Sequence, residues 1–382
     1  MGMVVGIDAS RNRSGGAKAY LLGMLRDGNP LAHGIRKVHV WAYQELLDAL
    51  PDASWLIKHN PPELERSLIH QVWWQYHFLP KEARRSECDL LFHTDAGAVC
   101  GFRPSVVMSQ DMLSYEPREM RRYGLSVARL RLILLRIIQT RSMKRADGVV
   151  FLTQYASRVI QQVIGGLRRI SVIPLGVGAA FRQRTPADGW ARGPGGKIRC
   201  LYVSNALLYK HQWMVVRAIG DLRSRGHNLS LLLVGGGAGR AQRLLDGEIA
   251  RTDPQRDFIE TKGFVPHDEI PALLAKADIF VFASSCENMP VTLVEAMASG
   301  LPIVCSARGP MPEIIKDGAV YFDPENPTSI SIAIEQIIMD HGMRESMAKR
   351  AKDLSAQYSW ARCASETWEF LRATGNGSRP TT

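Results

Sequence analysis

Two carboxylates stand out in the segment SSCENMPVTLVEAMASGLPIVCS, which covers residues 284–306 and is otherwise uncharged. Glu287 and Glu295 are its only charged residues, and seven residues separate them. The bland interpretation makes both of them solvated side chains, because charged residues are usually exposed. The helix expected around Glu295 has no other charge to define a solvent-facing side, however, and this favours a ligand-binding role for the pair.

Two further features could bind a phosphate-bearing ligand. Lys210 stands where a strand gives way to a helix, and a lysine beside free backbone N–H groups suits a phosphate. On its own, Lys210 fits a surface residue equally well. The glycine run GGGAG at residues 235–239 would let the backbone approach a ligand closely, or would simply form a tight turn. No Gly-Lys-Ser or Gly-Lys-Thr follows it, which excludes the phosphate loop of nucleoside triphosphatases.

Other catalytic classes find no support in the sequence. It contains no Asp-x-Asp motif and no pair of histidines at metal-ligand spacing. A diphosphate would then be neutralised by lysine, arginine and helix N-termini, so we expect a metal-independent site without a cofactor. A Gly-x-Ser-x-Gly motif is also absent, which argues against a serine hydrolase.

The elements that would position these residues follow from local patterns. Residues 277–283 read as a buried strand, residues 291–299 as a helix and residues 301–305 as a second strand. Strand, helix and strand form one βαβ unit of a parallel sheet, and ligands bind outside the carboxyl ends of such strands. We therefore expect Glu287 in a ligand-facing loop and Glu295 about one turn into the helix.

Strand patterns recur along the chain and alternate with helical stretches, which is typical of doubly wound α/β domains. The strands are expected at residues 3–8, 37–43, 89–93, 104–109, 148–153 and 170–174 of the first half, and at residues 198–203, 229–234, 258–264, 279–283, 302–305 and 319–322 of the second half. Residues 182–196 are rich in Pro, Gly and Arg and indicate a linker. We thus predict domains at residues 1–180 and 197–357 with a ligand cleft between them.

Length and composition are those of an ordinary globular protein. At 382 residues the chain exceeds the size of a single hydrophobic core. No run approaches the roughly 18 apolar residues of a membrane span. The six cysteines are scattered without CxxC spacing, so neither a zinc site nor a disulfide framework is indicated. These features predict a cytoplasmic protein with reduced thiols.

The formal net charge of +11 is unevenly distributed. Between Arg118 and Arg145 there are nine Lys or Arg residues against one acid, Glu119. Such a region could face an anionic membrane, a phosphorylated substrate or nucleic acid, or could be a solvated helix face. Because no nucleic-acid-binding motif accompanies it, nucleic acid is not expected as a partner. Peripheral attachment to the inner face of a membrane stays open.

Taken together, SSCENMPVTLVEAMASGLPIVCSARGPMPEII at residues 284–315 resembles the signature of the retaining glycosyltransferases with the GT-B architecture. That family carries two glutamates with seven residues between them, and the second glutamate, in the helix, is the first residue of Glu-Ala-Met-Ala-x-Gly-x-Pro. FVPHDE at residues 264–269 resembles its base-binding loop, and residues 202–210 resemble its phosphate loop. VIPLGV at residues 172–177 resembles its domain-junction motif, and SGG at residues 14–16 its amino-terminal glycine loop.

The resemblance implies an α/β fold of two Rossmann-like domains facing a central cleft, the first binding the acceptor and the second the donor. A C-terminal helix at about residues 358–374 would return to the first domain. Glu295 would hold the ribose hydroxyls of a nucleotide sugar, and Glu287 would lie beside the transferred sugar. Further donor contacts would come from Lys210 at the diphosphate, Val265 beside the base, Gly16 in the first domain, and the helix start formed by Asn288, Met289, Pro290 and Val291.

Two positions depart from the family pattern. Asn205 stands where many relatives have arginine, so that phosphate neutralisation would depend more on Lys210. Gln110 and Asp111 stand where many relatives have a His-Asp pair, and a glutamine can hydrogen-bond a sugar hydroxyl but cannot carry a proton. Asp111 and Glu287 are the expected catalytic residues, while Gln110 and Asn205 are expected donor contacts.

The implied activity is transfer of a sugar from a nucleotide-diphosphate donor, GDP-mannose in preference to a UDP-sugar, to a glycan or lipid-linked acceptor in surface polysaccharide synthesis. Retention would follow from same-face attack, with the leaving phosphate taking the acceptor's proton. One alternative is a GT-B sugar-nucleotide epimerase or phosphorylase. Another is a non-enzymatic membrane or polyanion binder that uses the region from Arg118 to Arg145.

Overall fold

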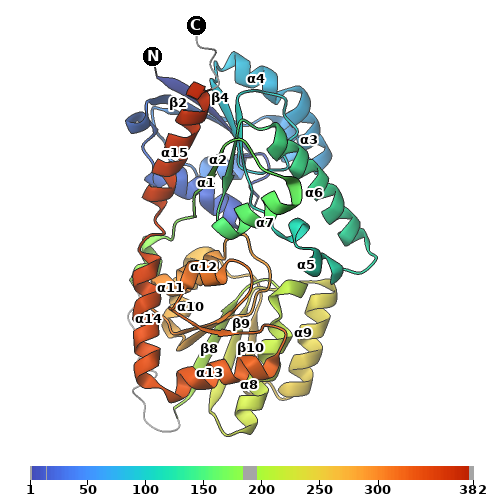
Figure 1. Cartoon of the computed structure of the whole chain (residues 1–382), viewed down its shortest axis with the longest axis vertical. Helices are drawn as coiled ribbons and strands as arrows, with labels where there is room; N and C mark the ends of the chain where they lie inside the picture. Colours follow the sequence, from blue (N-terminus) through green and yellow to red (C-terminus); the bar gives the residue numbers. More distant parts are fainter. Residues whose placement is uncertain (1, 14, 184–195, 378–382) are drawn as a thin grey trace. The chain divides into compact units, whose positions relative to one another are not determined.

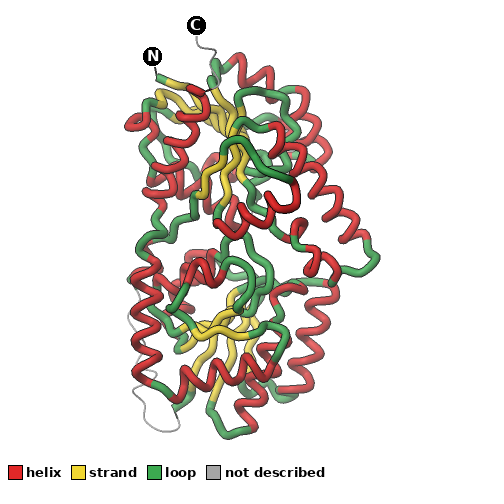
Figure 2. The backbone as a smooth tube through the Cα atoms, viewed as in Figure 1, coloured by secondary structure: helices red, strands yellow, loops and turns green. Residues whose placement is uncertain are grey.

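The chain folds into two compact α/β units. The structure, a computed structural model, describes residues 2–13, 15–183 and 196–377. The first unit comprises Met1–Gly176 and Tyr358–Thr382, and the second comprises Val177–Gln357. Ser14 of the expected glycine loop and residues 184–195 of the expected linker lie outside the described part. In each unit the strands form an inner layer between helices (Figures 1 and 2).

The first unit is built on a seven-stranded parallel sheet with the order β3-β2-β1-β4-β5-β6-β7. Its strands are β1 (Met3–Asp8), β2 (Ile35–Trp41), β3 (Leu56–His59), β4 (Leu90–His93), β5 (Ser105–Met108), β6 (Gly148–Phe151) and β7 (Ile170–Val172). The six strands predicted for this half are confirmed, but β3 was missed. It is a four-residue edge strand that pairs only with β2, and its sequence LIKH lacks the apolar alternation of a buried strand.

Helices cover both faces of this sheet. They are α1 (Gly15–Asp27), α2 (Gln44–Asp48), α3 (Leu68–His77), α4 (Leu79–Arg85), α5 (Pro117–Arg121), α6 (Val127–Arg145), α7 (Gln154–Ile164) and α15 (Trp360–Gly377). The last of these packs on the first, although they lie at opposite ends of the chain. A Cβ atom at Gly23 of α1 would lie 2.2 Å from the ring of Trp360, so only glycine permits this close approach.

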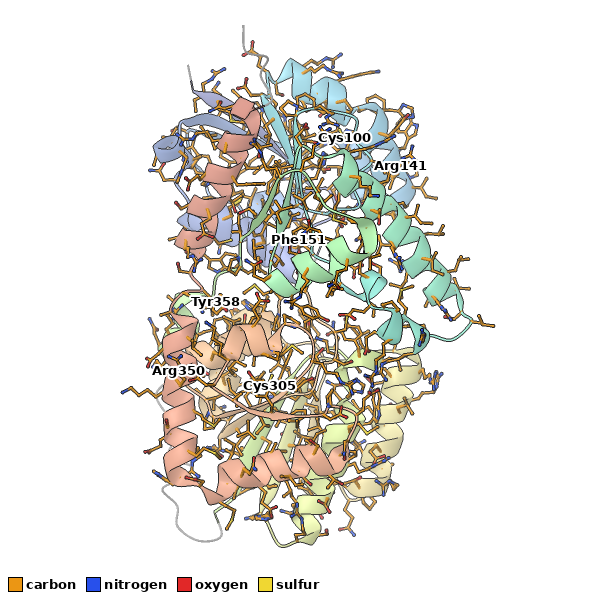
Figure 3. The ribbon with its side chains drawn as sticks, in the orientation of Figure 1. Cys100, Arg141, Phe151, Cys305, Arg350 and Tyr358 are labelled. Carbon is orange, nitrogen blue, oxygen red and sulfur yellow. The ribbon has the colours of Figure 1, made fainter. Side chains whose placement is uncertain are left out.

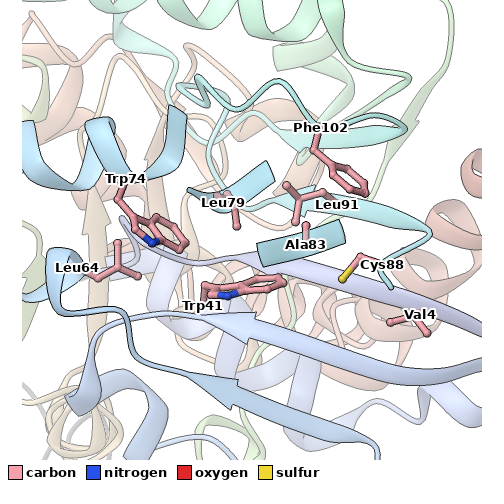
Figure 4. Packing of buried hydrophobic residues seen from close by; sticks show 9 residues of the cluster. All are labelled: Val4, Trp41, Leu64, Trp74, Leu79, Ala83, Cys88, Leu91 and Phe102. Atoms are coloured by element: carbon pink, nitrogen blue, oxygen red, sulfur yellow. The ribbon is translucent and has the colours of Figure 1, made fainter. Parts of the chain in front are cut away.

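An aromatic-rich core fixes α3 and α4 onto the sheet (Figure 4). Trp41 at the end of β2 and Trp74 of α3 are fully buried, and Leu79 of α4 and Leu91 of β4 pack with them. The remaining members of the cluster are Val4, Leu64, Ala83, Cys88 and Phe102. Burying side chains of this size supplies about 1.5–3 kcal/mol each, which stabilises the packing of α3 and α4 on the sheet.

The second unit repeats the plan with a six-stranded parallel sheet of order β10-β9-β8-β11-β12-β13. Its strands are β8 (Ile198–Val203), β9 (Leu229–Val234), β10 (Ile259–Lys262), β11 (Ile279–Phe282), β12 (Ile303–Ser306) and β13 (Val320–Phe322), and all six were predicted. Its helices are α8 (Gln212–Ser224), α9 (Gly239–Thr252), α10 (Ile270–Lys276), α11 (Val291–Ala298), α12 (Met311–Ile315), α13 (Pro327–Met339) and α14 (His341–Ser355). The predicted α/β class is therefore confirmed for both halves. No helix in the described part of the chain is long and apolar enough to cross a membrane.

Candidate functional site

The candidate site lies at the carboxyl edge of the second sheet. Strands β8 and β11 are neighbours there, but the chain leaves β8 toward β9 on one side and leaves β11 toward β12 on the other. Connections that diverge in this way open a crevice at the strand ends, the usual ligand position in such sheets. Lys210 follows β8, and Glu287 follows β11, so the topology brings these two predicted residues to one place.

Lys210 and Glu287 form an ion pair. The Lys210 ammonium donates a hydrogen bond to Oε1 of Glu287, and the two side chains are only 12% and 13% exposed. The ammonium also lies 5.3 Å from the ring centroid of Tyr209 and 5.5 Å from that of Phe282. An anionic ligand at this edge would thus meet a cation that is already held in position by a carboxylate and two rings.

A histidine that was missed in the sequence ties the loops after β8 and β11 together. His211 is buried, has a left-handed backbone (φ 49°, ψ 31°), and places its Nε2 2.9 Å from the hydroxyl of Ser285. The backbone N–H of Ser285 in turn donates to the carbonyl of Tyr209 at 2.8 Å. A non-glycine residue in this conformation is strained, which is a common property of functional loops. The sequence contains no signal for such a conformation.

Glu295 is the most unusual side chain of the site. It lies on α11, is 2% exposed, and has its Oε1 2.6 Å from Nε2 of His267 in the loop after β10. Its second oxygen, Oε2, is buried and has no hydrogen-bond partner among the described residues. A buried carboxylate oxygen without a donor is costly, by about 1–3 kcal/mol. The oxygen is therefore suited to a donor that a ligand brings.

The electrostatics of this pair follow from its surroundings. Burial raises the pKa of Glu295, although the hydrogen bond and the charge of His267 oppose the rise. The hydrogen bond to Glu295 raises the pKa of His267, against a lowering by burial. The His267 ring packs against Phe181 with the centroids 5.2 Å apart. His267 lies in the predicted base-binding loop, but the sequence did not reveal it as the partner of Glu295.

Glycines bring the loops after β8, β9 and β10 into backbone contact. Gly235 has φ 102° and donates its N–H to the carbonyl of Lys262, while Gly237 pairs with Ala206. A Cβ atom at Gly235 would lie 2.6 Å from the carbonyl oxygen of Ser204. The positive φ and the close approach of the Ser204 backbone therefore require glycine at position 235 without any ligand.

The other predicted donor contacts of this unit line the same loops. Asn205 is exposed directly after β8, and Val265 is partly exposed two residues before His267. Asn288, Met289 and Pro290 are buried in the connection from β11, and Val291 is the first residue of α11. Within residues 2–13, 15–183 and 196–377, no three His, Cys, Asp or Glu side chains gather as a metal site would require.

The remaining predicted residues belong to the first unit. Gln110 follows β5 and donates from Nε2 to the carbonyl of Thr94 at 2.7 Å. Asp111 accepts hydrogen bonds from the N–H of Leu113 at 3.2 Å and the hydroxyl of Ser114 at 2.5 Å, and burial raises its pKa. Gly16 lies in the first turn of α1, where a Cβ would make only ordinary contacts, so packing within this unit does not require a glycine.

The first unit also holds a buried polar cluster that was missed in the sequence. Asp8 ends β1 and lies 2.8 Å from Nδ1 of His93, which ends β4, and both are fully buried. Gln75 of α3 donates a further hydrogen bond to Asp8. Burial alone would raise the pKa of Asp8, but the hydrogen bond and charge of His93 outweigh it and lower the pKa to about 2. Strands β1 and β4 are adjacent, but the chain continues from β1 to β2 on one side and from β4 to β5 on the other, as it does from β8 and β11 in the second sheet.

Comparison with known proteins matches this architecture. The model of the family described as glycosyl transferases group 1 matches residues 191–354. O-antigen chain mannosyltransferase B of Escherichia coli is 32% identical over 31% of this chain and 32% of its own length. The GDP-mannose-dependent alpha-(1-6)-phosphatidylinositol monomannoside mannosyltransferase of Mycobacterium tuberculosis is 26% identical over 59% of this chain and 62% of its own length. The chain thus matches a third to three-fifths of these curated relatives.

The fold comparison extends over the whole chain. The structure of Anabaena HepE in complex with UDP and glucose superposes with a TM-score of 0.73 at 20% identity, covering 97% of this chain and 100% of that one. Agreement over both units shows the fold that the sequence signature implied. The family of glycosyl transferases group 1 is thus matched by the second unit, over residues 191–354, and the two α/β units have the GT-B fold.

Proposed function

We propose that the protein is a glycosyltransferase that binds a nucleotide-diphosphate sugar at the carboxyl edge of its second sheet. The observation that carries the proposal is Oε2 of Glu295, a buried acceptor without a partner among the described residues. A ribose offers two hydroxyl donors, and either could satisfy this oxygen. The family match over the same unit and the UDP complex of HepE support a nucleotide as the ligand.

The rest of the donor would extend across the strand ends from this anchor. Val265 precedes His267 in its loop and would flank the base. The Lys210 ammonium would contact the diphosphate, and its interaction with Glu287 would weaken as it binds the negative charge of the ligand. Asn205 and the N-terminus of α11 would add neutral donors. The Glu287 carboxylate would then be free to accept a hydrogen bond from a hydroxyl group of the sugar.

The chemistry we propose is substitution at the anomeric carbon with retention. The bond from that carbon to the diphosphate breaks, a bond to the acceptor oxygen forms on the same face, and the leaving phosphate oxygen takes the acceptor's proton. Positive charge develops on the sugar, as in other glycosyl transfers. Lys210 and the helix N-terminus would stabilise the departing diphosphate, so we propose that no metal is needed. Asp111 and Gln110 of the first unit are proposed to contact the transferred sugar.

Mannose is the sugar that the comparisons favour. Both curated relatives above are named mannosyltransferases, and one is named as GDP-mannose-dependent. HepE, by contrast, is bound to UDP and glucose. We therefore propose GDP-mannose as the donor, with a UDP-sugar as the alternative. A glycan or lipid-linked acceptor in surface polysaccharide synthesis fits the O-antigen and phosphatidylinositol substrates in the relatives' names.

Calorimetric titration with GDP and with UDP, each with and without EDTA, tests the proposal. We expect saturable binding of one nucleotide that EDTA leaves unchanged. Failure of both to bind would contradict the nucleotide site, and loss of binding in EDTA would contradict metal independence. Incubation with the matching sugar nucleotide in the absence of acceptor should leave the sugar unchanged, because interconversion of the donor would indicate an epimerase instead.

A further inference from the structure

Helices α3 and α6 of the first unit differ from ordinary surface helices, because two of the three buried side chains of each helix are polar while most of their large apolar side chains are exposed. The buried residues of α6 are Gln139, Ser142 and Met143. Its Leu130, Ile133, Leu134, Ile137 and Ile138 are 40–58% exposed, and Leu125 in the turn before it is fully exposed. Helix α3 likewise buries Gln71, Trp74 and Gln75 and exposes Leu68, Ile69, Trp73 and Tyr76.

The buried polar groups are satisfied, so this arrangement is not a packing fault. Gln75 hydrogen-bonds Asp8, and Gln71 donates to the carbonyl of Arg66 at 2.8 Å. Gln139 accepts from the hydroxyl of Ser114 at 3.2 Å. The apolar faces of the two helices therefore point outward while their buried polar groups are hydrogen-bonded. Exposed apolar surface of this extent marks an interaction site.

A groove runs between the two helices. Its cavity volume is about 810 Å³, and its walls are formed by α3 residues such as Ile69 and Trp73 and by α6 residues such as Ile138. The connection from β4 to β5, residues 94–104, is described throughout and contains no helix. Val107 of β5, which is almost fully buried, and the loop residue Cys100 also line the groove. Cys100 and Arg141, labelled in Figure 3, both line this groove.

The apolar stripe of α6 ends in positive charge. The exposed apolar residues recur at spacings of three and four, and Arg141 and Arg145 continue the stripe of Leu134 and Ile138. Both arginines line the groove, and neither forms an ion pair with a described acidic side chain. The acid next along the chain, Asp147, pairs with Arg103. An occupant must therefore offer hydrocarbon to the groove and an anion to its basic end.

We propose that this α3–α6 groove binds one hydrocarbon chain of an anionic membrane phospholipid, with the lipid phosphate held by Arg141 and Arg145. The exposed apolar residues of α3 and α6 would enter the headgroup region of the same bilayer, where Trp73 and Tyr76 suit the boundary between apolar and polar layers. Nucleic acid would not use the apolar stripe. The site goes beyond the proposed transfer chemistry and does not depend on it.

Vesicle binding tests the charged end of the site. The full-length protein is sedimented with phosphatidylcholine vesicles that contain or lack phosphatidylglycerol. We expect binding only to the anionic vesicles, and weakening of at least about tenfold by Arg141→Glu with Arg145→Glu, because each basic side chain near an anionic surface contributes about fivefold. The matched control is Arg243→Glu with Lys349→Glu, which changes the net charge equally on exposed positions of the second unit.

Fluorescence quenching tests the apolar end. Phosphatidylglycerol with brominated chains should quench tryptophan emission, and Trp73→Phe should remove part of that quenching, whereas Trp213→Phe in α8 should not. An absent Trp73 component would overturn the groove as a chain site. Three outcomes would overturn the lipid site. The control pair could weaken vesicle binding as much as the arginine pair does, or the arginine pair could leave vesicle binding unchanged. The protein could also self-associate through these helices in place of binding vesicles.

Nucleotide binding separates this proposal from the proposed function. The Arg141→Glu/Arg145→Glu variant should bind the nucleotide as the wild type does, which shows that its second unit is folded, and an unshifted transition of the first unit in scanning calorimetry shows the same for the unit that carries the substitutions. Lipid binding without any nucleotide binding would support the groove and contradict the transferase site. Nucleotide binding without lipid binding would support the transferase site and contradict the groove as a lipid site.

Discussion

At the scale of single residues, the second unit joins the candidate carboxylate Glu295 of α11 to His267, which comes from the loop after β10. The sequence could identify Glu295, because a lone charge inside an apolar helix is conspicuous. It could not identify His267 as the partner, since the contact depends on how the β10 loop crosses α11 in space. The same limit applies to the ion pair of Lys210 with Glu287, whose members were predicted separately.

The pair makes a prediction for pH dependence. The pKa values of Glu295 and His267 are both raised in the folded state. The folded protein therefore holds more protons, and the stability that they contribute is complete below about pH 4.5 for the carboxyl and below about pH 6.5 for the histidine. This contribution is lost as the pH rises through the folded pKa values.

Replacing Glu295 by Gln should remove that dependence. The free energy of unfolding of Glu295→Gln minus that of the wild type should increase by about 1–2 kcal/mol as the pH rises from 5 to 8. The wild type acquires a buried charge with an unsatisfied oxygen over this range, whereas the variant stays neutral at this position. Urea denaturation at several pH values measures the difference. Glu269→Gln, an exposed carboxyl in the neighbouring loop, serves as the control. A constant difference across this pH range would contradict the assignment.

At the scale of elements, the strand patterns of the sequence predicted most of the fold. Buried parallel strands are continuous apolar runs, so twelve of the thirteen strands within the described residues could be placed from the sequence, while the short edge strand β3 could not. Helix α6 shows another limit. Its arginines do not gather on one face of a helical projection, because Arg129, Arg131 and Arg136 are interspersed with the apolar residues. Only its last turn and a half, which contains Arg141 and Arg145, follows the apolar stripe.

The loops that carry the candidate site depend on Gly235. Gly235→Ala should destabilise the protein by more than Gly239→Ala, although both positions have positive φ. Each substitution introduces strain of about 1–3 kcal/mol. Only at Gly235 does the new Cβ collide with backbone, at Ser204, whereas Gly239 has nothing within 4 Å. Urea denaturation gives the two costs, and the nucleotide affinity should fall with Gly235→Ala alone. Equal costs would show that the contact between the β8 and β9 loops is not constrained.

At the scale of the whole molecule, the chain forms its first unit from both ends. Helix α15 packs on α1, and Trp368 of α15 is fully buried beside Gly28. The residue pattern alone could not predict which unit this helix joins, because an amphipathic helix can cover either sheet. That expectation came only from the resemblance to the family.

Trp368→Ala should therefore act on the first unit. We expect a loss of about 3–5 kcal/mol, typical of truncating a buried tryptophan. In scanning calorimetry, the transition of the first unit should move to lower temperature, while the transition that nucleotide raises should stay in place. If both transitions shift together, the two units do not unfold separately.

The central claim is that Oε2 of Glu295 accepts a hydrogen bond from the donor's ribose, and a thermodynamic cycle tests it most directly. The affinity of the nucleotide that binds, GDP or UDP, is compared with that of its 2′,3′-dideoxy analogue for the wild type and for Glu295→Gln. We predict that the wild type loses about tenfold or more on removal of the hydroxyls, equivalent to at least about 1.4 kcal/mol, and that the variant loses little further. Fully additive losses, or unchanged nucleotide affinity in Glu295→Gln, would contradict the account.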